Sequence, residues 1–222
     1  MNINKQLDKL CMEHFQNRAY VADGIFFGSN ADAWNSIHPK VLFVLKQPNS
    51  DNLLGEDYRE YDFDTCVGEQ VWRELLGRLY GMMHTDESGF PKYDKATEIK
   101  SLKEAFCQYP FAVINIIKDI GNGTTPTADL KKYALQNLEF LQKQLELLQP
   151  NIIVCCGSGV FDIVNQAIQP SIPSNGNWLK YNSDRNIIFF DTYHPGKPNS
   201  RKVLQEAYDK PLEEFHMFLK KK

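Results

Sequence analysis

The sequence predicts an α/β protein, a three-layer α/β/α sandwich built around a central four-stranded parallel sheet. The first observation behind this prediction is a set of four short apolar runs, at residues 41–45, 111–117, 151–156 and 186–190. Each run is rich in β-branched or aromatic residues and is continuous, which is typical of strands covered on both faces. The second observation is that helical patterns separate the runs, so right-handed β-α-β crossovers are expected.

Helices are predicted where apolar residues recur at spacings of three or four between the strands. The clearest pattern covers residues 128–148, with Thr127 as the expected N-cap and Pro150 just beyond the end. The last helix is expected to be interrupted before Pro211, because proline cannot donate the backbone hydrogen bond of a helix. The predicted helices cover residues 4–15, 69–79, 128–148, 159–168 and 201–219.

Length and composition predict one domain spanning residues 1–222. A chain of 222 residues can bury one sizeable core, and its hydrophobic fraction of 42% is ordinary for a globular protein. The net charge is −3, whereas proteins that bind DNA without sequence preference usually carry a basic excess. Any contact with nucleic acid is therefore expected to be local.

Cysteine usage and the N-terminal sequence predict a cytoplasmic protein. The five cysteines form no C-x-x-C pair, so neither a disulfide framework nor a zinc site is expected. The N-terminus lacks the apolar core of a signal peptide, and no apolar stretch approaches the length of a membrane span. We expect no membrane contact, no metal and no cofactor.

The loops after the four predicted strands are the expected binding region, because α/β sheets bind ligands beyond the carboxyl ends of their strands. These loops cover residues 46–51, 118–126, 157–159 and 191–201. These loops carry glycine or proline beside polar side chains, which lets a backbone approach a ligand closely.

Four motifs in these segments resemble, in order, those of the uracil-DNA glycosylase superfamily. The run L-F-V-L-K-Q-P-N-S-D is similar to its first motif, in which a buried strand ends in a short proline-containing loop. The segments V-I-N-I-I-K-D, G-N-G-T-T-P-T-A-D-L and L-L-Q-P-N-I-I-V-C-C-G-S-G resemble the middle of its iron–sulfur branch. The run F-D-T-Y-H-P-G-K-P-N-S-R resembles its final His-Pro-Ser loop. Together the motifs span residues 41–202.

The resemblance implies a uracil-DNA glycosylase-like fold and a DNA base-excision hydrolase that cleaves the N-glycosidic bond of uracil or another deaminated base. By position, His194 would hydrogen-bond the base carbonyl as negative charge develops there. Asn115 would read the Watson–Crick edge of the extruded base, and Gln47 would orient the attacking water. These roles suit an oxocarbenium-like transition state, in which the departing base becomes negative and pre-placed donors stabilise it.

Further roles follow from the same resemblance. Pro48 would shape the loop that presses on the sugar–phosphate backbone, and an aromatic residue would stack on the base. Phe63 is the expected stacking residue, although the alignment could place Cys66 there instead. The residues expected to contact phosphate are Lys46, Ser158, Lys197 and Arg201.

The sequence also departs from the family pattern. Gln47 stands where active branches have Asp or Asn, and Lys46 replaces the neighbouring Glu or Gln. Asp51 lies a few residues downstream, and we hypothesise that it supplies the missing acid. The four cysteine ligands of the iron–sulfur branch are absent, so no metal cluster is expected.

Two other functions remain open. A protein that kept the fold and pocket but lost the reaction would bind a nucleobase, nucleotide or nucleic acid without cleaving it, because fold alone does not fix function. An unrelated α/β nucleotide-binding protein is the third reading. Against it, neither G-x-x-x-x-G-K-[ST] nor G-x-G-x-x-G follows a predicted strand.

Overall fold

The computed structural model describes residues 2–16, 18, 20–26, 31–49, 56–121, 125–196 and 200–221. Six strands form one mixed sheet in the order β1-β3-β2-β4-β6-β5. The prediction of an α/β protein is confirmed. The strands are β1 (Gly24–Ile25), β2 (Val41–Leu45), β3 (Phe111–Asn115), β4 (Ile152–Cys156), β5 (Leu179–Asn182) and β6 (Ile187–Thr192).

The four predicted strands are β2, β3, β4 and β6, and they run parallel in the centre of the sheet. The expected total of four strands was wrong, because β1 and β5 are two further strands, which pair antiparallel with β3 and β6 at the sides of the sheet. The β1 strand has only two residues, and β5 reads L-K-Y-N. Neither segment is long or apolar enough to stand out as a strand in the sequence.

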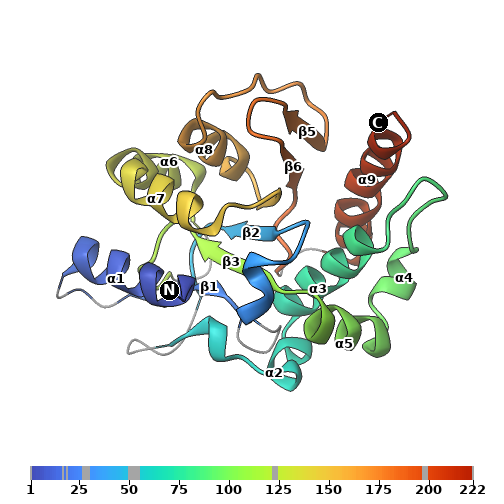
Figure 1. The fold of residues 1–222 in the computed structure, drawn as a ribbon, viewed down its shortest axis with the longest axis horizontal. Coiled ribbons are helices and arrows are strands. Elements are labelled where there is room, and N and C mark those ends of the chain that lie inside the picture. Colours follow the sequence, from blue (N-terminus) through green and yellow to red (C-terminus); the bar gives the residue numbers. More distant parts are fainter. Residues whose placement is uncertain are drawn as a thin grey trace.

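Helices cover both faces of the sheet (Figure 1). Phe43 of β2 packs into a core shared with α2, α3, α4, α5 and α9. Its neighbour Val44 points to the other face and packs with α1, α6, α7 and α8, as the alternation of side chains along a strand requires. The helices are α1 (Ile3–Phe15), α2 (Phe63–Gly68), α3 (Gln70–Met83), α4 (Tyr93–Ala96), α5 (Ile99–Gln108), α6 (Thr127–Gln136), α7 (Leu138–Leu148), α8 (Val160–Ala167) and α9 (Arg201–Leu219).

The predicted helix over 128–148 is two helices, α6 and α7, which meet at Asn137 in a non-helical conformation (φ −122°, ψ 22°). The Asn137 side chain donates to the Tyr133 carbonyl at 2.8 Å and contacts His14 of α1 at 2.7 Å. A tertiary partner therefore stabilises the break. The cap prediction was also wrong, since Thr127 is the first helical residue and Pro126 precedes it.

Helix α9 continues through Pro211, contrary to the predicted interruption. Pro211 has no N–H to donate to the carbonyl of Ala207, four residues earlier. The Thr192 hydroxyl, at the end of β6, donates to that carbonyl at 2.9 Å instead. A side chain from the sheet thus replaces the hydrogen bond that proline removes.

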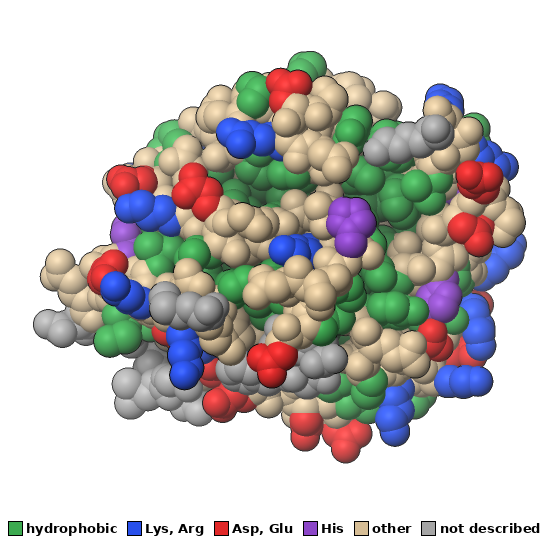
Figure 2. All heavy atoms as spheres, in the orientation of Figure 1, with side chains coloured by type: hydrophobic (Ala, Val, Ile, Leu, Met, Phe, Trp, Pro, Cys, Tyr) green, Lys and Arg blue, Asp and Glu red, His purple; other side chains and the backbone are tan. Residues whose placement is uncertain are grey.

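The space-filling view shows acidic and basic side chains interspersed over one face of the molecule (Figure 2). This distribution agrees with the small net charge of −3. Among the described residues, no helix has the length and apolar character needed to cross a bilayer.

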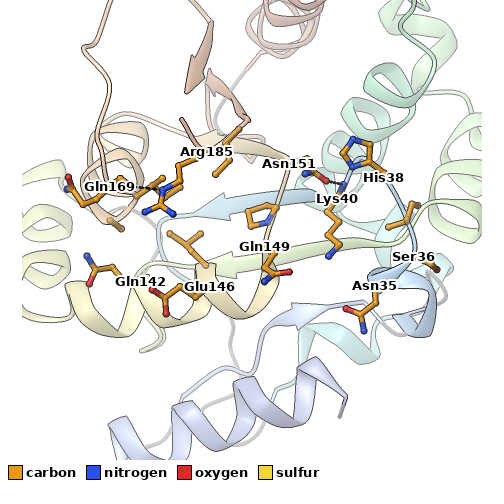
Figure 3. A pocket seen from close by; sticks show the side chains of 16 residues that line it. Asn35, Ser36, His38, Lys40, Gln142, Glu146, Gln149, Asn151, Gln169 and Arg185 are labelled. Atoms are coloured by element: carbon orange, nitrogen blue, oxygen red, sulfur yellow. Dashed lines mark hydrogen bonds between the residues drawn. The ribbon is translucent and has the colours of Figure 1, made fainter. Parts of the chain in front are cut away.

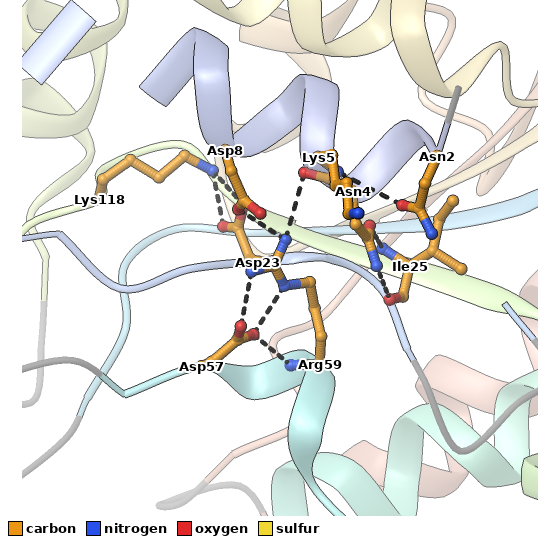
Figure 4. Close-up of polar contacts among 9 residues, drawn as sticks. All are labelled: Asn2, Asn4, Lys5, Asp8, Asp23, Ile25, Asp57, Arg59 and Lys118. Carbon is orange, nitrogen blue, oxygen red and sulfur yellow. Dashed lines mark hydrogen bonds and ion pairs between the residues drawn. The ribbon is translucent and has the colours of Figure 1, made fainter. Parts of the chain in front are cut away.

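A buried ion pair joins Asp23, directly before the edge strand β1, to Lys118 in the loop after β3 (Figure 4). The Lys118 ammonium lies 2.6 Å from both carboxylate oxygens of Asp23, and the Lys118 side chain is fully buried. Asp23 also accepts the backbone N–H of Asn115 at 2.7 Å. The pair therefore fixes the position at which β3 ends.

We predict that Lys118→Met lowers the free energy of unfolding by about 3 kcal/mol, because it leaves the Asp23 carboxylate buried without a counter-charge. Urea denaturation of the variant beside wild type measures the change. The double variant Asp23→Asn/Lys118→Met should recover part of the loss, since it removes both charges. A single-variant loss below about 1 kcal/mol would contradict a structural role for this pair.

Candidate functional site

The carboxyl ends of the central strands meet at one edge of the sheet, so the predicted loops do come together. Leu45 of β2 lies opposite Asn115 of β3, and Cys156 of β4 lies opposite Thr192 of β6. Hydrogen bonds continue beyond the strands, from the Ile117 N–H to the Lys46 carbonyl at 2.9 Å and from the Gly157 N–H to the Thr192 carbonyl at 2.7 Å. We call the region where these four strands end the carboxyl edge.

Gly157 brings Lys46 and His194 together. A Cβ atom placed on Gly157 would lie 3.1 Å from Lys46 Cε and 3.5 Å from His194 Cβ. The two side chains therefore flank one point, and the φ of +111° at Gly157 also favours glycine. Lys46 Nζ donates to the Ser158 hydroxyl at 3.3 Å. Three predicted site residues, Lys46, Ser158 and His194, thus gather after β2, β4 and β6.

The local contacts of His194 set its protonation state. Its Nδ1 accepts the backbone N–H of Gly196 at 3.0 Å. Burial, the Arg78 guanidinium and the Lys46 ammonium lower the pKa of His194 to about 4. The imidazole is therefore neutral at pH 7, and because Nδ1 is an acceptor, the ring proton lies on Nε2.

Helix α3 holds the loop on both sides of His194. Arg78 Nη1 donates to the Tyr193 carbonyl at 3.2 Å, and Gln70 Nε2 donates to the Pro195 carbonyl at 3.1 Å. The Arg78 side chain is buried, and its Nε and Nη2 have no hydrogen-bond partner among the described residues. This guanidinium therefore fixes the backbone before His194 and adds positive potential beside it.

Gln70 and Arg78 were not predicted from the sequence as site residues. Arg78 lies three residues after Leu75, on the apolar side of α3. A charged residue on a buried helical stripe is unusual, and that signal could have indicated a special role. Glu74, one turn earlier, is also buried and accepts the Tyr93 hydroxyl at 2.8 Å.

Asn115 is the last residue of β3, and its side chain is buried. Neither its amide nitrogen nor its amide oxygen has a hydrogen-bond partner among the described residues. By alternation, the side chain points to the face that carries Val113 and α3. A buried amide without partners costs about 1–3 kcal/mol, so this group is a candidate for binding a ligand.

Gln47 and Pro48 tie the loop after β2 to the loop after β3. The Gln47 amide donates to the Asp119 carbonyl at 3.0 Å and accepts the Thr125 hydroxyl at 2.6 Å. The Pro48 carbonyl accepts the Gly121 N–H at 2.9 Å. Both ends of the Gln47 amide are therefore engaged by the neighbouring loop.

The other predicted residues lie in different surroundings. Phe63 of α2 is half-buried and contacts the Phe106 ring of α5, with ring centroids 5.8 Å apart. Cys66 is fully buried, and burial raises the pKa of its thiol to about 12. Arg201 begins α9 and forms an ion pair with Asp94 of α4. Asp51 and Lys197 lie outside the described residues.

Two further carboxylates near the strand ends are described, and each pairs with a cation. Asp119 pairs with Arg18 at 3.0 Å, and Asp191 pairs with the buried Lys180 at 3.0 Å. Within the described ranges, no group of three or more His, Cys, Asp or Glu side chains could hold a metal ion.

No protein-family model matches the sequence, and no curated protein sequence matches it. The fold is thus that of an α/β protein whose carboxyl edge carries a neutral histidine with two nearby cations. Strand β3 ends at the same edge in a buried asparagine amide without partners among the described residues.

We predict that His194 titrates near pH 4 when its ring resonances are followed by NMR. Arg78→Met should raise this pKa, because it removes a positive charge that disfavours protonation, and Lys46→Met should act in the same direction. Lys100→Met, at an exposed position of α5, is the matched control and should change nothing. A wild-type pKa at the ordinary value of 6.5 would contradict this account of the site.

The free energy of unfolding should depend on the protonation of His194. The unfolded chain binds it near pH 6.5, whereas the folded chain binds it only near pH 4, so acidification through this window favours unfolding. We expect the free energy of unfolding from urea denaturation to fall between these pH values, and to fall less in His194→Gln. An identical pH dependence in both proteins would be the contrary result.

Proposed function

We propose that this chain is a uracil-DNA glycosylase-like hydrolase that releases uracil or another deaminated base from DNA. The observation that carries the proposal is the neutral His194, whose Nδ1 accepts the Gly196 N–H and whose pKa is lowered to about 4. A glycosylase of this type needs a hydrogen-bond donor at the base carbonyl, and a neutral imidazole with its proton on Nε2 supplies one.

The charges around His194 support this role. Cleavage of the N-glycosidic bond moves negative charge onto the base, and donors in a buried site stabilise that charge more than donors in water do. Lys46 and Arg78 are the two cations whose charge acts on His194. Their positive potential favours an anionic base and disfavours an imidazolium. The histidine would therefore act as a neutral hydrogen-bond donor to the base.

Asn115 supports recognition of the base. Uracil presents a carbonyl acceptor beside an imino N–H donor, and a carboxamide offers the complementary pair of groups. The Asn115 amide is buried and lacks partners among the described residues. A base bound at the carboxyl edge would satisfy both of its polar atoms.

A uracil-DNA glycosylase-like form of the fold is part of the same proposal. The four parallel strands carry the four motifs, and their order across the sheet is second, first, third and fourth along the chain. The strands that carry the first and second motifs are therefore neighbours, which supports a base pocket shared between them.

A DNA strand is the proposed partner. Tyr193, directly before His194, is 42% exposed and makes an edge contact with Trp178, with ring centroids 5.1 Å apart. Exposed aromatic rings give unpaired bases a surface on which to stack. Lys46, directly after β2, and Ser158, in the turn before α8, form a hydrogen bond with each other. Both offer polar groups to a phosphate.

The state of Gln47 favours a second candidate function, binding of a nucleobase without hydrolysis. Both ends of the Gln47 amide are hydrogen-bonded within the protein, so it would have to exchange a partner to hold a water. The described aspartates near the strand ends, Asp119 and Asp191, pair with cations. Neither is positioned as an uncommitted base for the reaction.

We predict that the protein releases uracil from a uracil-containing single-stranded oligonucleotide, and that His194→Ala slows release about 100-fold, as loss of one oxyanion donor does. Asn115→Leu should also abolish release, because the base loses its polar partner. The measurement is single-turnover release of the free base, with Lys100→Ala as the control that keeps wild-type rates.

The outcomes separate the two candidates. Release that depends on His194 supports the hydrolase. Uracil binding that Asn115→Leu removes, without any release, supports the binding protein. If wild type neither releases nor binds uracil, both candidates are wrong.

A further inference from the structure

A cavity of about 620 Å³ opens at the opposite edge of the sheet, where the parallel strands begin. Its wall includes Lys40 before β2, Pro150 and Asn151 before β4, and Ile187 at the start of β6 (Figure 3). We call it the amino-edge cavity. The six-residue step from Lys40 to Lys46 along β2 corresponds to roughly 20 Å, so this cavity is separate from the carboxyl edge.

Two cations face the amino-edge cavity from different elements. Lys40 is held by its backbone N–H, which donates to the Asn151 side chain at 2.9 Å. Its ammonium group has no hydrogen bond or ion pair with a described residue. Arg185, in the turn between β5 and β6, donates from Nε to the Gln169 carbonyl and has no carboxylate partner among the described residues. These two cations outnumber the single carboxylate among the described lining residues, so the cavity carries a net positive charge.

The rest of the lining is divided between apolar and amide groups. The apolar lining includes Leu145, Ile168 and Ile187. These residues are 6%, 7% and 9% exposed. Gln142 and Gln149 of the α7 region add amide groups, which can donate and accept hydrogen bonds. Among the described lining residues, Glu146 is the only carboxylate.

We propose that the amino-edge cavity is a second ligand site, which binds a small amphipathic anion: a planar, largely apolar ring that carries a phosphate or carboxylate group. The apolar wall accepts the ring, the amides bind its polar edge, and Lys40 and Arg185 bind the anionic group. The volume falls within the range of pockets for ligands of nucleotide size, about 300–1,000 Å³. A nucleoside monophosphate is the representative ligand, and the site does not depend on the function proposed for the carboxyl edge.

Isothermal titration of adenosine monophosphate into the full-length protein tests this site. We expect saturable binding that weakens about tenfold in Lys40→Gln and in Arg185→Gln, the loss typical of one charge-assisted hydrogen bond. Lys100→Gln is the matched control and should bind as wild type does. Inorganic phosphate alone should bind more weakly than the nucleotide, because it does not use the apolar wall.

The His194→Ala variant separates this test from that of the carboxyl edge, since it should bind the nucleotide at the amino-edge cavity with unchanged affinity. Three results would each overturn the proposal. They are no binding up to about 10 mM, equal binding by wild type, Lys40→Gln and Arg185→Gln, and phosphate binding as tight as nucleotide binding. Retained melting temperatures show that a weakened variant is folded.

Discussion

The burial of the central strands is the constraint on which the rest of this structure depends. Every side chain of β2, β3 and β4 is buried, so polar groups cannot be accommodated along these strands without a partner. Polar chemistry is therefore confined to the two ends of the sheet. At one end Lys46 and His194 flank Gly157 and Asn115 ends β3, and at the other end Lys40 and Arg185 line a cavity. One packing rule thus produces both candidate sites.

Helix α3 helps to set the protonation state of His194 at the carboxyl edge. Its Arg78 lies in a largely apolar layer and keeps two nitrogen atoms without partners among the described residues. Buried polar groups of this kind cost stability, and natural proteins tolerate such costs mainly at functional sites. Here the guanidinium holds the Tyr193 carbonyl and acts on the charge of His194. The unpartnered amide of Asn115 is a second group of the same kind.

Features that depend on local composition could be predicted from the sequence. Continuous apolar runs predicted the four parallel strands, and the order of their loops brought Lys46, Ser158 and His194 together. Features that depend on a partner distant in sequence were not predictable. The break between α6 and α7 at Asn137 depends on a contact with His14. Helix α9 continues through Pro211 because Thr192 supplies a hydrogen bond. The backbone on both sides of His194 is hydrogen-bonded by Gln70 and Arg78. The amino-edge cavity was also not predicted, because part of its lining comes from residues that precede the strands, whereas the sequence predicted a binding region after them.

In the proposed function, the carboxyl edge receives a nucleobase between Asn115 and His194. The most direct test is to add uracil to isotope-labelled protein and to follow the Asn115 side-chain amide and the His194 ring by two-dimensional NMR. We expect saturable shifts of both groups and no shift of the residues around Lys40, because the two ends of the strands are roughly 20 Å apart. Shifts confined to the amino-edge cavity, or none at saturating uracil, would contradict it.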